Sequence, residues 1–277
     1  MQKIIIIGAK GMLGQDLVTI FSGDNNYEVI TLDRNEIDIT KENEVKEKIS
    51  NLKPEIVINA AAYTDVEGCE DNKELCLKVN GEALKYLAKA CQENNTILVH
   101  YSTDYIFNGE KKEGYKEDYN QINPINVYGE GKALGEKNIK ENCDQYYILR
   151  TSWLFGKNGK NFVDTMLSLA QKLKELKVIN DQQGKPTYTI DLAKRTKEIL
   201  ENKEEFGIYH VTNEDKTTWY KFALEIFRQA GVNIRVNPCT SEEFPTKAKR
   251  PHYSSLINTK LSKMRSWKEA LGDYLKK

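Results

Sequence analysis

The sequence predicts an α/β fold in which a doubly wound parallel sheet carries a smaller, interleaved C-terminal lobe. Three observations predict it. Short β-branched runs alternate with helix-period segments in the first half of the chain, the first run leads straight into a glycine-rich turn, and the rhythm changes after Trp153. Apolar runs buried on both faces, with helices between them, are typical of a parallel sheet.

The expected elements of the first half come in alternating order. The strands cover Lys3–Ile7, Glu28–Leu32, Ile56–Asn59, Ile97–Tyr101 and Tyr147–Arg150, and the helices between them cover Met12–Phe21, Glu42–Ser50, Lys73–Cys91 and Val127–Asn142. Right-handed crossovers place the carboxyl ends of such strands along one edge of the sheet, where ligands bind. We therefore expect the functional site at that edge.

The second half shows a different order of elements. We expect helices at about Phe162–Leu173, Asp191–Glu201 and Thr218–Ala230, and strands at Val178–Asn180 and Ile208–Val211. We assign residues 1–152 and about 189–212 to the sheet domain, and about 153–188 and 213–277 to the smaller lobe. The late pieces of the sheet domain thus interrupt the lobe in sequence.

Charge and composition narrow the function classes. Lys+Arg and Asp+Glu both number 41, so no net field favours nucleic acid or an acidic membrane surface. Apolar runs such as Ile4–Ile7 are too short to span a bilayer, and no targeting segment follows Met1. The cysteines number five and never form C-x-x-C, which fits reduced thiols. We expect a cytoplasmic protein that binds neither nucleic acid nor membrane.

A glycine-rich turn follows the first strand. Gly8, Gly11 and Gly14 allow a tight turn and a close approach of diphosphate to the backbone, and the free N–H groups of the helix at Met12 and Leu13 face that diphosphate. A carboxylate, Asp33, ends the second strand 19 residues after Gly14, where it suits the adenosine ribose hydroxyls. The turn therefore predicts a dinucleotide site.

The choice between NADH and NADPH stays open at this point. Asp33 favours the free ribose hydroxyl of NADH, whereas the neighbouring Arg34 can meet the 2′-phosphate of NADPH. Small residues after the third strand, Ala60–Ala62, leave room for the cofactor; plain packing beside a turn is the competing interpretation.

A tyrosine and a lysine four residues apart, Tyr128 and Lys132, lie on the expected helix that Asn123-Pro124 would open. Hydride reduction of a ketone leaves an alkoxide that needs a proton and a polarising donor. A free phenol, with a pKa of about 10, is a poor acid near neutrality, and an adjacent ammonium lowers that pKa. We expect Tyr128 to donate the proton, Lys132 to assist it, and Thr103 of Ser102-Thr103-Asp104-Tyr105 to bond the carbonyl oxygen.

Two further residues are candidate substrate contacts. The ring of Trp153 can stack on a sugar, with a buried core tryptophan as the alternative. Arg250 can clamp a diphosphate bidentately, with an ordinary surface arginine as the alternative. The three histidines show no metal-pair spacing, and we expect them to be structural.

The chain resembles the extended short-chain dehydrogenase/reductases, and among them the dTDP-4-dehydrorhamnose reductase family. The resemblance rests on the G-x-x-G-x-x-G spacing and on ordered segments along the chain, among them NAAAYTDVEGCE (59–70), HYSTDYIFNG (100–109), NPINVYGEGKALGE (123–136), VINDQQGKPTY (178–188) and RPHYSSL (250–256). It implies a Rossmann-type sheet and the reduction of dTDP-4-dehydro-L-rhamnose by NADPH or NADH, which supplies dTDP-L-rhamnose for surface polysaccharide.

The resemblance also implies roles for individual residues. The catalytic ones are Thr103, Tyr128 and Lys132. The cofactor contacts that it implies are Gly11, Met12, Leu13, Asp33, Asp38, Ile39, Ala62, Tyr63 and Thr64, and the sugar contacts are Thr103, Asp104 and Trp153. The sequence pattern adds further expected cofactor contacts at Gly8, Gly14, Arg34, Ala60, Ala61, Tyr128 and Lys132. It also adds expected substrate contacts at Tyr105, Tyr128 and Arg250.

One departure from the family concerns a magnesium site at a dimer contact of some members. Asp16 matches its first acid, but Pro186–Asp191 lacks the paired acids that complete it. We therefore expect no metal, and a monomer or weak homodimer.

Two other functions stay open. One is a related nucleotide-sugar 4-ketoreductase or epimerase that acts on another deoxysugar. The other is a non-catalytic, NADP-binding regulatory subunit, against which the intact Thr103, Tyr128 and Lys132 set argues.

Overall fold

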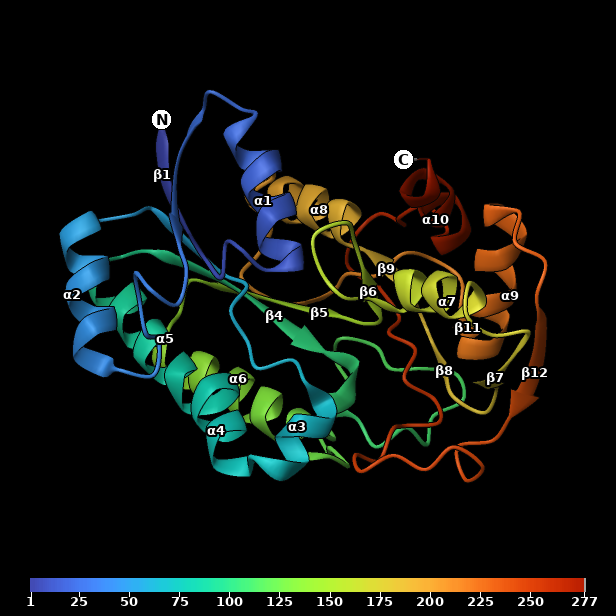
Figure 1. Cartoon of the computed structure of the whole chain (residues 1–277). Helices are drawn as coiled ribbons and strands as arrows, with labels where there is room; N and C mark the ends of the chain where they lie inside the picture. Colours follow the sequence, from blue (N-terminus) through green and yellow to red (C-terminus); the bar gives the residue numbers. More distant parts are fainter. Residues whose placement is uncertain (277) are drawn as a thin grey trace.

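A six-stranded parallel sheet is the centre of the computed structural model, which describes residues 1–276 (Figure 1). Its strand order is β10-β5-β4-β3-β1-β2. The strands are β1 (Gln2–Ile7), β2 (Tyr27–Leu32), β3 (Ile56–Asn59), β4 (Ile97–Thr103), β5 (Tyr146–Thr151) and β10 (Gly207–His210). The order reverses between β1 and β3, and ligands bind at such a point in doubly wound folds.

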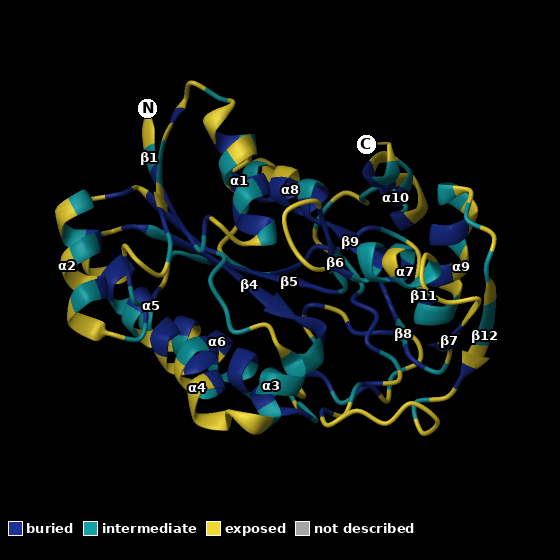
Figure 2. Cartoon of the chain, viewed as in Figure 1, coloured by how far each residue is buried: buried dark blue, intermediate teal, exposed yellow. Residues whose placement is uncertain are grey.

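Helices cover both faces of this sheet because alternate residues of each strand point to opposite sides. Ile4 and Ile6 of β1 join the core under α1 (Met12–Ser22) and α8 (Thr189–Glu201). Ile5 and Ile7 join the core under α2 (Glu42–Leu52), α5 (Ala83–Glu93) and α6 (Val127–Asn142). Full burial of each isoleucine contributes about 1.5–3 kcal/mol. Figure 2 shows the buried strands between partly exposed helices.

The second half of the chain builds a separate aromatic core. Phe155, Phe222 and Trp267 are buried there. The elements around it are α7 (Phe162–Ala170), α9 (Trp219–Ala230), α10 (Trp267–Leu275), β7 (Glu175–Ile179) and β12 (Arg235–Cys239), with the short strands β6 (Leu154–Phe155), β8 (Gln183–Gly184), β9 (Thr187–Tyr188) and β11 (Thr217–Thr218). We call this part, on the right of Figure 1, the smaller lobe.

The predicted fold class is confirmed, and every strand predicted for the sheet lies within two residues of its observed bounds. The predicted division of the chain stays a prediction, although β10 does pair with β5 as that division requires. The sequence patterns did not predict α3 (Val66–Asp71), β12 or α10, which are short or carry Pro or Gly.

The helix predicted over Lys73–Cys91 contains a turn of another kind. It runs as α4 (Lys73–Leu77), a π-helical turn η1 (Lys78–Glu82) and α5. The wider turn carries the buried Asn80, whose side chain accepts from the Tyr63 N–H at 2.8 Å and donates to the Tyr63 carbonyl at 2.9 Å. A π turn inside a helix often marks a functional region, and this one holds the segment that follows β3.

Candidate functional site

A cavity of about 570 Å³ opens at the carboxyl ends of β3, β4 and β5, between the sheet and the smaller lobe. It brings together most of the predicted site residues: Gly11, Met12, Leu13, Gly14, Ala60, Ala61, Ala62, Thr64, Thr103, Asp104, Tyr105, Tyr128, Lys132 and Trp153. The structure therefore joins the glycine turn, the Thr103 segment and the Tyr128/Lys132 pair in one place.

Seven predicted residues do not line the cavity: Gly8, Asp33, Arg34, Asp38, Ile39, Tyr63 and Arg250. Gly8 lies behind it, at φ +78°, where a Cβ atom would come within 2.7 Å of the Ala61 nitrogen. Asp33 follows β2, next to the glycine turn through the bond from the Gly8 N–H to the Leu32 carbonyl at 2.8 Å.

The glycine turn fits a diphosphate. Gly11 is the N-cap of α1 and supplies no side-chain cap, so the first N–H groups of the helix have no such partner. A Cβ atom at Gly14 would lie 2.1 Å from the Gly8 carbonyl oxygen, so only glycine permits this close turn. Backbone donors and the positive end of the helix dipole thus face the cavity.

Lys10, inside the glycine turn, forms an ion pair with Asp33 that the sequence analysis missed. The Lys10 ammonium holds the pKa of Asp33 at about 2, so this residue is a carboxylate at neutral pH. The carboxylate can accept from ribose hydroxyls, and the cation beside it can bind a phosphate. Adjacent Lys10 and Asp33 therefore leave both nicotinamide cofactors possible.

Helix α6 places the side chains of Tyr128 and Lys132 at the wall of the cavity. The helix begins at Val127, because the Asn126 side chain caps it by accepting from the Gly129 N–H at 2.7 Å. The predicted bounds Val127–Asn142 match the observed helix, and Asn126 rather than Asn123-Pro124 opens it. Residues 128 and 132 are one turn apart on the same face, and both line the cavity.

Thr103 connects the end of β4 to Tyr128. Its hydroxyl accepts from the Tyr105 N–H at 3.2 Å, donates to Asp104 Oδ1 at 3.1 Å and contacts the Tyr128 hydroxyl. The rings of Tyr105 and Tyr128 meet edge to face, with centroids 6.1 Å apart. Two hydroxyl groups thus converge where a carbonyl oxygen could be held.

Burial, rather than Lys132, has the largest influence on the pKa of Tyr128 in this structure. Burial raises the pKa of the Tyr128 phenol, and the Asp104 carboxyl adds to that rise. The amine of Lys132 bonds instead to the Tyr101 carbonyl and to His100 Nε2, and burial lowers its own pKa to about 8. Tyr128 is therefore held protonated, which is the form a proton donor needs.

Asp104 is an unusual carboxyl group beside these two hydroxyls. It is 2% exposed, its Oδ2 makes no hydrogen bond within residues 1–276, and the Ser254 hydroxyl contacts the carboxyl group. Burial raises the pKa of Asp104 to about 7. A buried polar atom without a partner is costly unless a ligand supplies one, so Asp104 is available to bind a substrate hydroxyl.

Trp153 lines the cavity with one face already covered. Its ring stacks on Trp219 at a centroid distance of 3.6 Å, and its backbone adopts φ +48°, which is rare for a bulky residue. The predicted stacking on a sugar is therefore limited to its other face or its edge. Nothing in the sequence spacing pointed to Trp219, which also lines the cavity.

Arg250 lies beyond Tyr105. Its guanidinium pairs with Glu67 at 2.6 Å, bonds Thr246 Oγ1 at 2.8 Å and contacts the Tyr105 hydroxyl. It is therefore neither an isolated surface arginine nor a lining residue of the cavity. The smaller lobe meets α3 through this ion pair.

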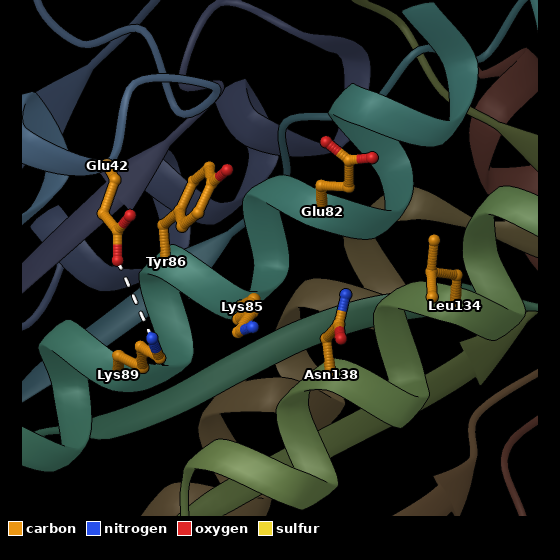
Figure 3. A pocket seen from close by; sticks show the side chains of 7 residues that line it. All are labelled: Glu42, Glu82, Lys85, Tyr86, Lys89, Leu134 and Asn138. Carbon is orange, nitrogen blue, oxygen red and sulfur yellow. Dashed lines mark ion pairs between the residues drawn. The ribbon is translucent and has the colours of Figure 1, made fainter. Parts of the chain in front are cut away.

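A second cavity, of about 460 Å³, is a poorer candidate. It lies between α5 and α6 and is lined by Glu42, Glu82, Lys85, Tyr86, Lys89, Leu134 and Asn138 (Figure 3). Glu42 and Lys89 form an ion pair across it at 3.8 Å. It contains none of the predicted catalytic or cofactor residues.

No group of three or more His, Cys, Asp or Glu side chains within residues 1–276 is placed to hold a metal ion. No helix in the same range is long and apolar enough to cross a membrane.

Comparison with known proteins decides the family. A family model described as RmlD substrate binding domain matches residues 1–277. The chain belongs to this family. A dTDP-4-dehydrorhamnose reductase from Aggregatibacter actinomycetemcomitans is 42% identical over 94% of this chain and 92% of that protein.

Solved structures of the same family agree in fold. A dTDP-4-dehydrorhamnose reductase from Clostridium acetobutylicum has a TM-score of 0.95 and 42% identity, covering 99% of this chain and 98% of that one. Another, from Bacillus anthracis in complex with NADP, has a TM-score of 0.94 and 37% identity, with the same coverage. The family resemblance drawn from the sequence motifs is confirmed.

Proposed function

We propose that this protein reduces the 4-keto group of dTDP-4-dehydro-L-rhamnose with NADPH or NADH, giving dTDP-L-rhamnose. The observation that carries the proposal is the convergence of Thr103 and Tyr128 in one cavity with the glycine turn. Family membership supports it, because relatives of similar length are named for this activity.

The cofactor would lie along the edge of the sheet. The glycine turn and the start of α1 would hold its diphosphate, Asp33 its adenosine ribose, and Lys132 its nicotinamide ribose. The family resemblance assigns Asp38, Ile39 and Tyr63 to the cofactor, and Arg34, next to Asp33, would meet a 2′-phosphate. When bound, the reduced nicotinamide supplies the hydride.

The residues of the chain supply the rest of the chemistry. Tyr128 donates a hydrogen bond to the ketone oxygen, and Thr103 donates a second once its hydroxyl proton turns from Asp104 Oδ1 to that oxygen. As hydride reaches C4, the phenol of Tyr128 transfers its proton to the developing alkoxide, so the products are an alcohol and oxidised cofactor. Lys132 lies one turn away and, in its charged form, can stabilise the phenolate that remains. Proton recovery from solvent completes the cycle.

The substrate would occupy the part of the cavity that faces the smaller lobe. Asp104, Tyr105 and Trp153 would contact the sugar, and Arg250 would reach the diphosphate once Glu67 releases it. A cytoplasmic location is part of the same proposal, and the five free cysteines are consistent with it. We also propose a monomer or weak homodimer.

The test is a reduction with deuterium-labelled cofactor. Purified protein is given dTDP-4-dehydro-L-rhamnose with each labelled reduced nicotinamide in turn, and the sugar is analysed by NMR. We expect deuterium at C4 of a product with the rhamno configuration. Consumption of the ketosugar without label at C4, or release of tightly held NAD from the protein, would favour an epimerase. No turnover together with a co-purifying enzyme would favour the regulatory function.

A further inference from the structure

His100 lies in a buried series of hydrogen bonds that runs from the Ala61 N–H through Asn59 and His100 to Lys132. It pairs in register with Asn59 across β3 and β4, and both side chains are at most 1% exposed. His100 Nδ1 faces Asn59 Nδ2 at 3.1 Å, and His100 Nε2 faces Lys132 Nζ at 3.0 Å. The Asn59 Oδ1 accepts from the Ala61 N–H at 3.1 Å. The sequence alone predicts only a structural role for this histidine.

The direction of each bond follows from the backbone. The Ala61 N–H can only donate, so the atom of Asn59 that faces it is the carbonyl oxygen and the atom that faces His100 is the amide nitrogen. An amide nitrogen has no lone pair to offer, so it donates to His100 Nδ1. His100 therefore carries its proton on Nε2 and donates toward Lys132.

The His100 Nε2–H group points at Lys132 and therefore favours the uncharged amine, because only that form has a free lone pair on Nζ. An uncharged amine accepts from His100 Nε2–H and still donates to the Tyr101 carbonyl. An ammonium has three donors and no acceptor, so it would face the imidazole N–H donor to donor. Charging Lys132 thus requires that this chain of bonds be broken or reversed.

We propose that His100 is a positioning residue of this site: Asn59 holds its imidazole as the Nε2–H tautomer, and that N–H orients the Lys132 amine and opposes its protonation. The proposal deepens the proposed function, because Lys132 acts there beside Tyr128. Its first part, the tautomer, holds whether or not the ketosugar is the substrate.

The other titratable groups around Lys132 favour its protonation, whereas the His100 N–H opposes it. Glu136 on α6 and Cys76 on α4 both raise its pKa, while burial is the largest influence and lowers it. Tyr128 lies one turn earlier on α6 and remains uncharged near neutrality. Burial and, to a smaller extent, the charged form of Lys132 lower the pKa of His100, while a contact with the Asn59 backbone raises it, and the net effect keeps His100 neutral. His100 is therefore the group whose removal should make Lys132 more basic.

The tautomer can be observed directly. The chain has three histidines, so ¹⁵N-histidine labelling gives a spectrum that single substitutions assign. We expect the proton of His100 on Nε2 in the free protein at pH 8. Asn59→Asp places a carboxylate against Nδ1 and should move the proton to that nitrogen. A wild-type His100 that is protonated on Nδ1, or on both nitrogens, would refute the proposal.

The second readout is the basic limb of kcat/KM against pH, which reports groups of the free enzyme. His100→Leu should move this limb upward by about 0.5–1 pH unit, because the net free energy of one hydrogen bond corresponds to a pKa shift of about that size. His100→Gln, whose Nε2 can still donate, should restore it. Asp104 titrates nearby, so each profile is repeated with Asp104→Asn.

A matched control separates positioning from packing. His210 is as buried as His100 but bonds the Ile257 carbonyl and the Arg150 guanidinium, away from Lys132. His210→Leu should lower stability and leave the limb where it is. If the His100→Leu protein folds and the basic limb of its kcat/KM profile does not shift, His100 has only a packing role. If the protein lacks ketosugar activity altogether, the proposed function fails while the NMR result still decides the tautomer.

Discussion

At the scale of single residues, the chemistry of the site depends on the protonation states of Tyr128 and Lys132. Tyr128 keeps its proton because burial and Asp104 oppose its ionisation, and Thr103 orients its hydroxyl. Lys132 is buried, with its pKa lowered to about 8. A general acid with a high pKa is useful only where the product oxygen is a stronger base, and an alkoxide is such a base.

Asp104 should cost stability in the folded protein. Its pKa is about 7 when folded and about 3.9 when unfolded, so the folded state holds an extra proton between these values. Stability therefore falls as pH rises from about 4 to 7, and the penalty is complete above pH 7. Asp104→Asn should raise the free energy of unfolding by roughly 2–4 kcal/mol at pH 8.

Urea unfolding at pH 8 and at pH 3 measures this effect. The gain should vanish at pH 3, where both states are protonated. An Asp104→Asn protein with equal stability gain at both values would mean that ionisation of Asp104 is not responsible.

Asp33 should distinguish the two cofactors. Asp33→Ala removes the acceptor for a ribose hydroxyl and leaves Lys10 and Arg34 beside the vacated place. NADH affinity should fall roughly tenfold or more, the loss of one hydrogen bond to a charged group. NADPH affinity should fall less, because Lys10 is then free to meet the phosphate. Titration calorimetry with both cofactors decides the point, and equal losses would exclude this role for Asp33.

At the scale of elements, close backbone contacts fix the walls of the cavity. β8 approaches the Trp153 ring so closely that a Cβ atom at Gly184 would lie 2.6 Å from its Cε2 atom. Trp153 cannot simply move away, because Trp219 of α9 stacks on its ring. The pair of tryptophans is thus set by two elements of the smaller lobe.

Gly184→Ala should therefore displace Trp153 and raise the KM for the nucleotide sugar by roughly tenfold to a hundredfold, as small misplacements do. NADPH affinity should be unchanged, because the glycine turn is untouched. Gly23→Ala, at the end of α1, is the control and should leave both constants alone. A normal KM with a displaced Trp153 would remove this tryptophan from substrate binding.

At the scale of the whole molecule, two lobes meet over one cavity. Arg250 of the smaller lobe pairs with Glu67 of α3, and Lys247 pairs with Asp71 at 2.6 Å nearby. These ion pairs are partly or largely exposed, so they add little to stability. The Arg250 guanidinium also contacts the hydroxyl of Tyr105, which lines the cavity.

Arg250→Ala should accordingly raise the KM for the nucleotide sugar at least about tenfold, because a charged contact to the diphosphate is lost. Lys247→Ala removes the neighbouring ion pair and is the matched control, with an unchanged KM expected. An unchanged KM in Arg250→Ala would assign this arginine only to the contact with Glu67.

Much of this architecture follows from local sequence patterns. The sheet strands, the glycine turn and the Tyr128/Lys132 spacing are periodic or positional signals, and the structure places them as expected. The ion pair of Lys10, the stacking of Trp219 and the His100–Asn59 contact join residues distant in sequence, or lack any spacing rule. The pKa of Tyr128 depends on burial, which sequence spacing does not report.

The most direct test of the central claim is Tyr128→Phe. The phenyl ring keeps the shape of the site and removes the proton that the mechanism transfers. We expect kcat for ketosugar reduction to fall at least about a hundredfold, while the Kd for NADPH stays within about twofold. Turnover retained within tenfold of wild type, by a folded protein that binds NADPH normally, would contradict the account.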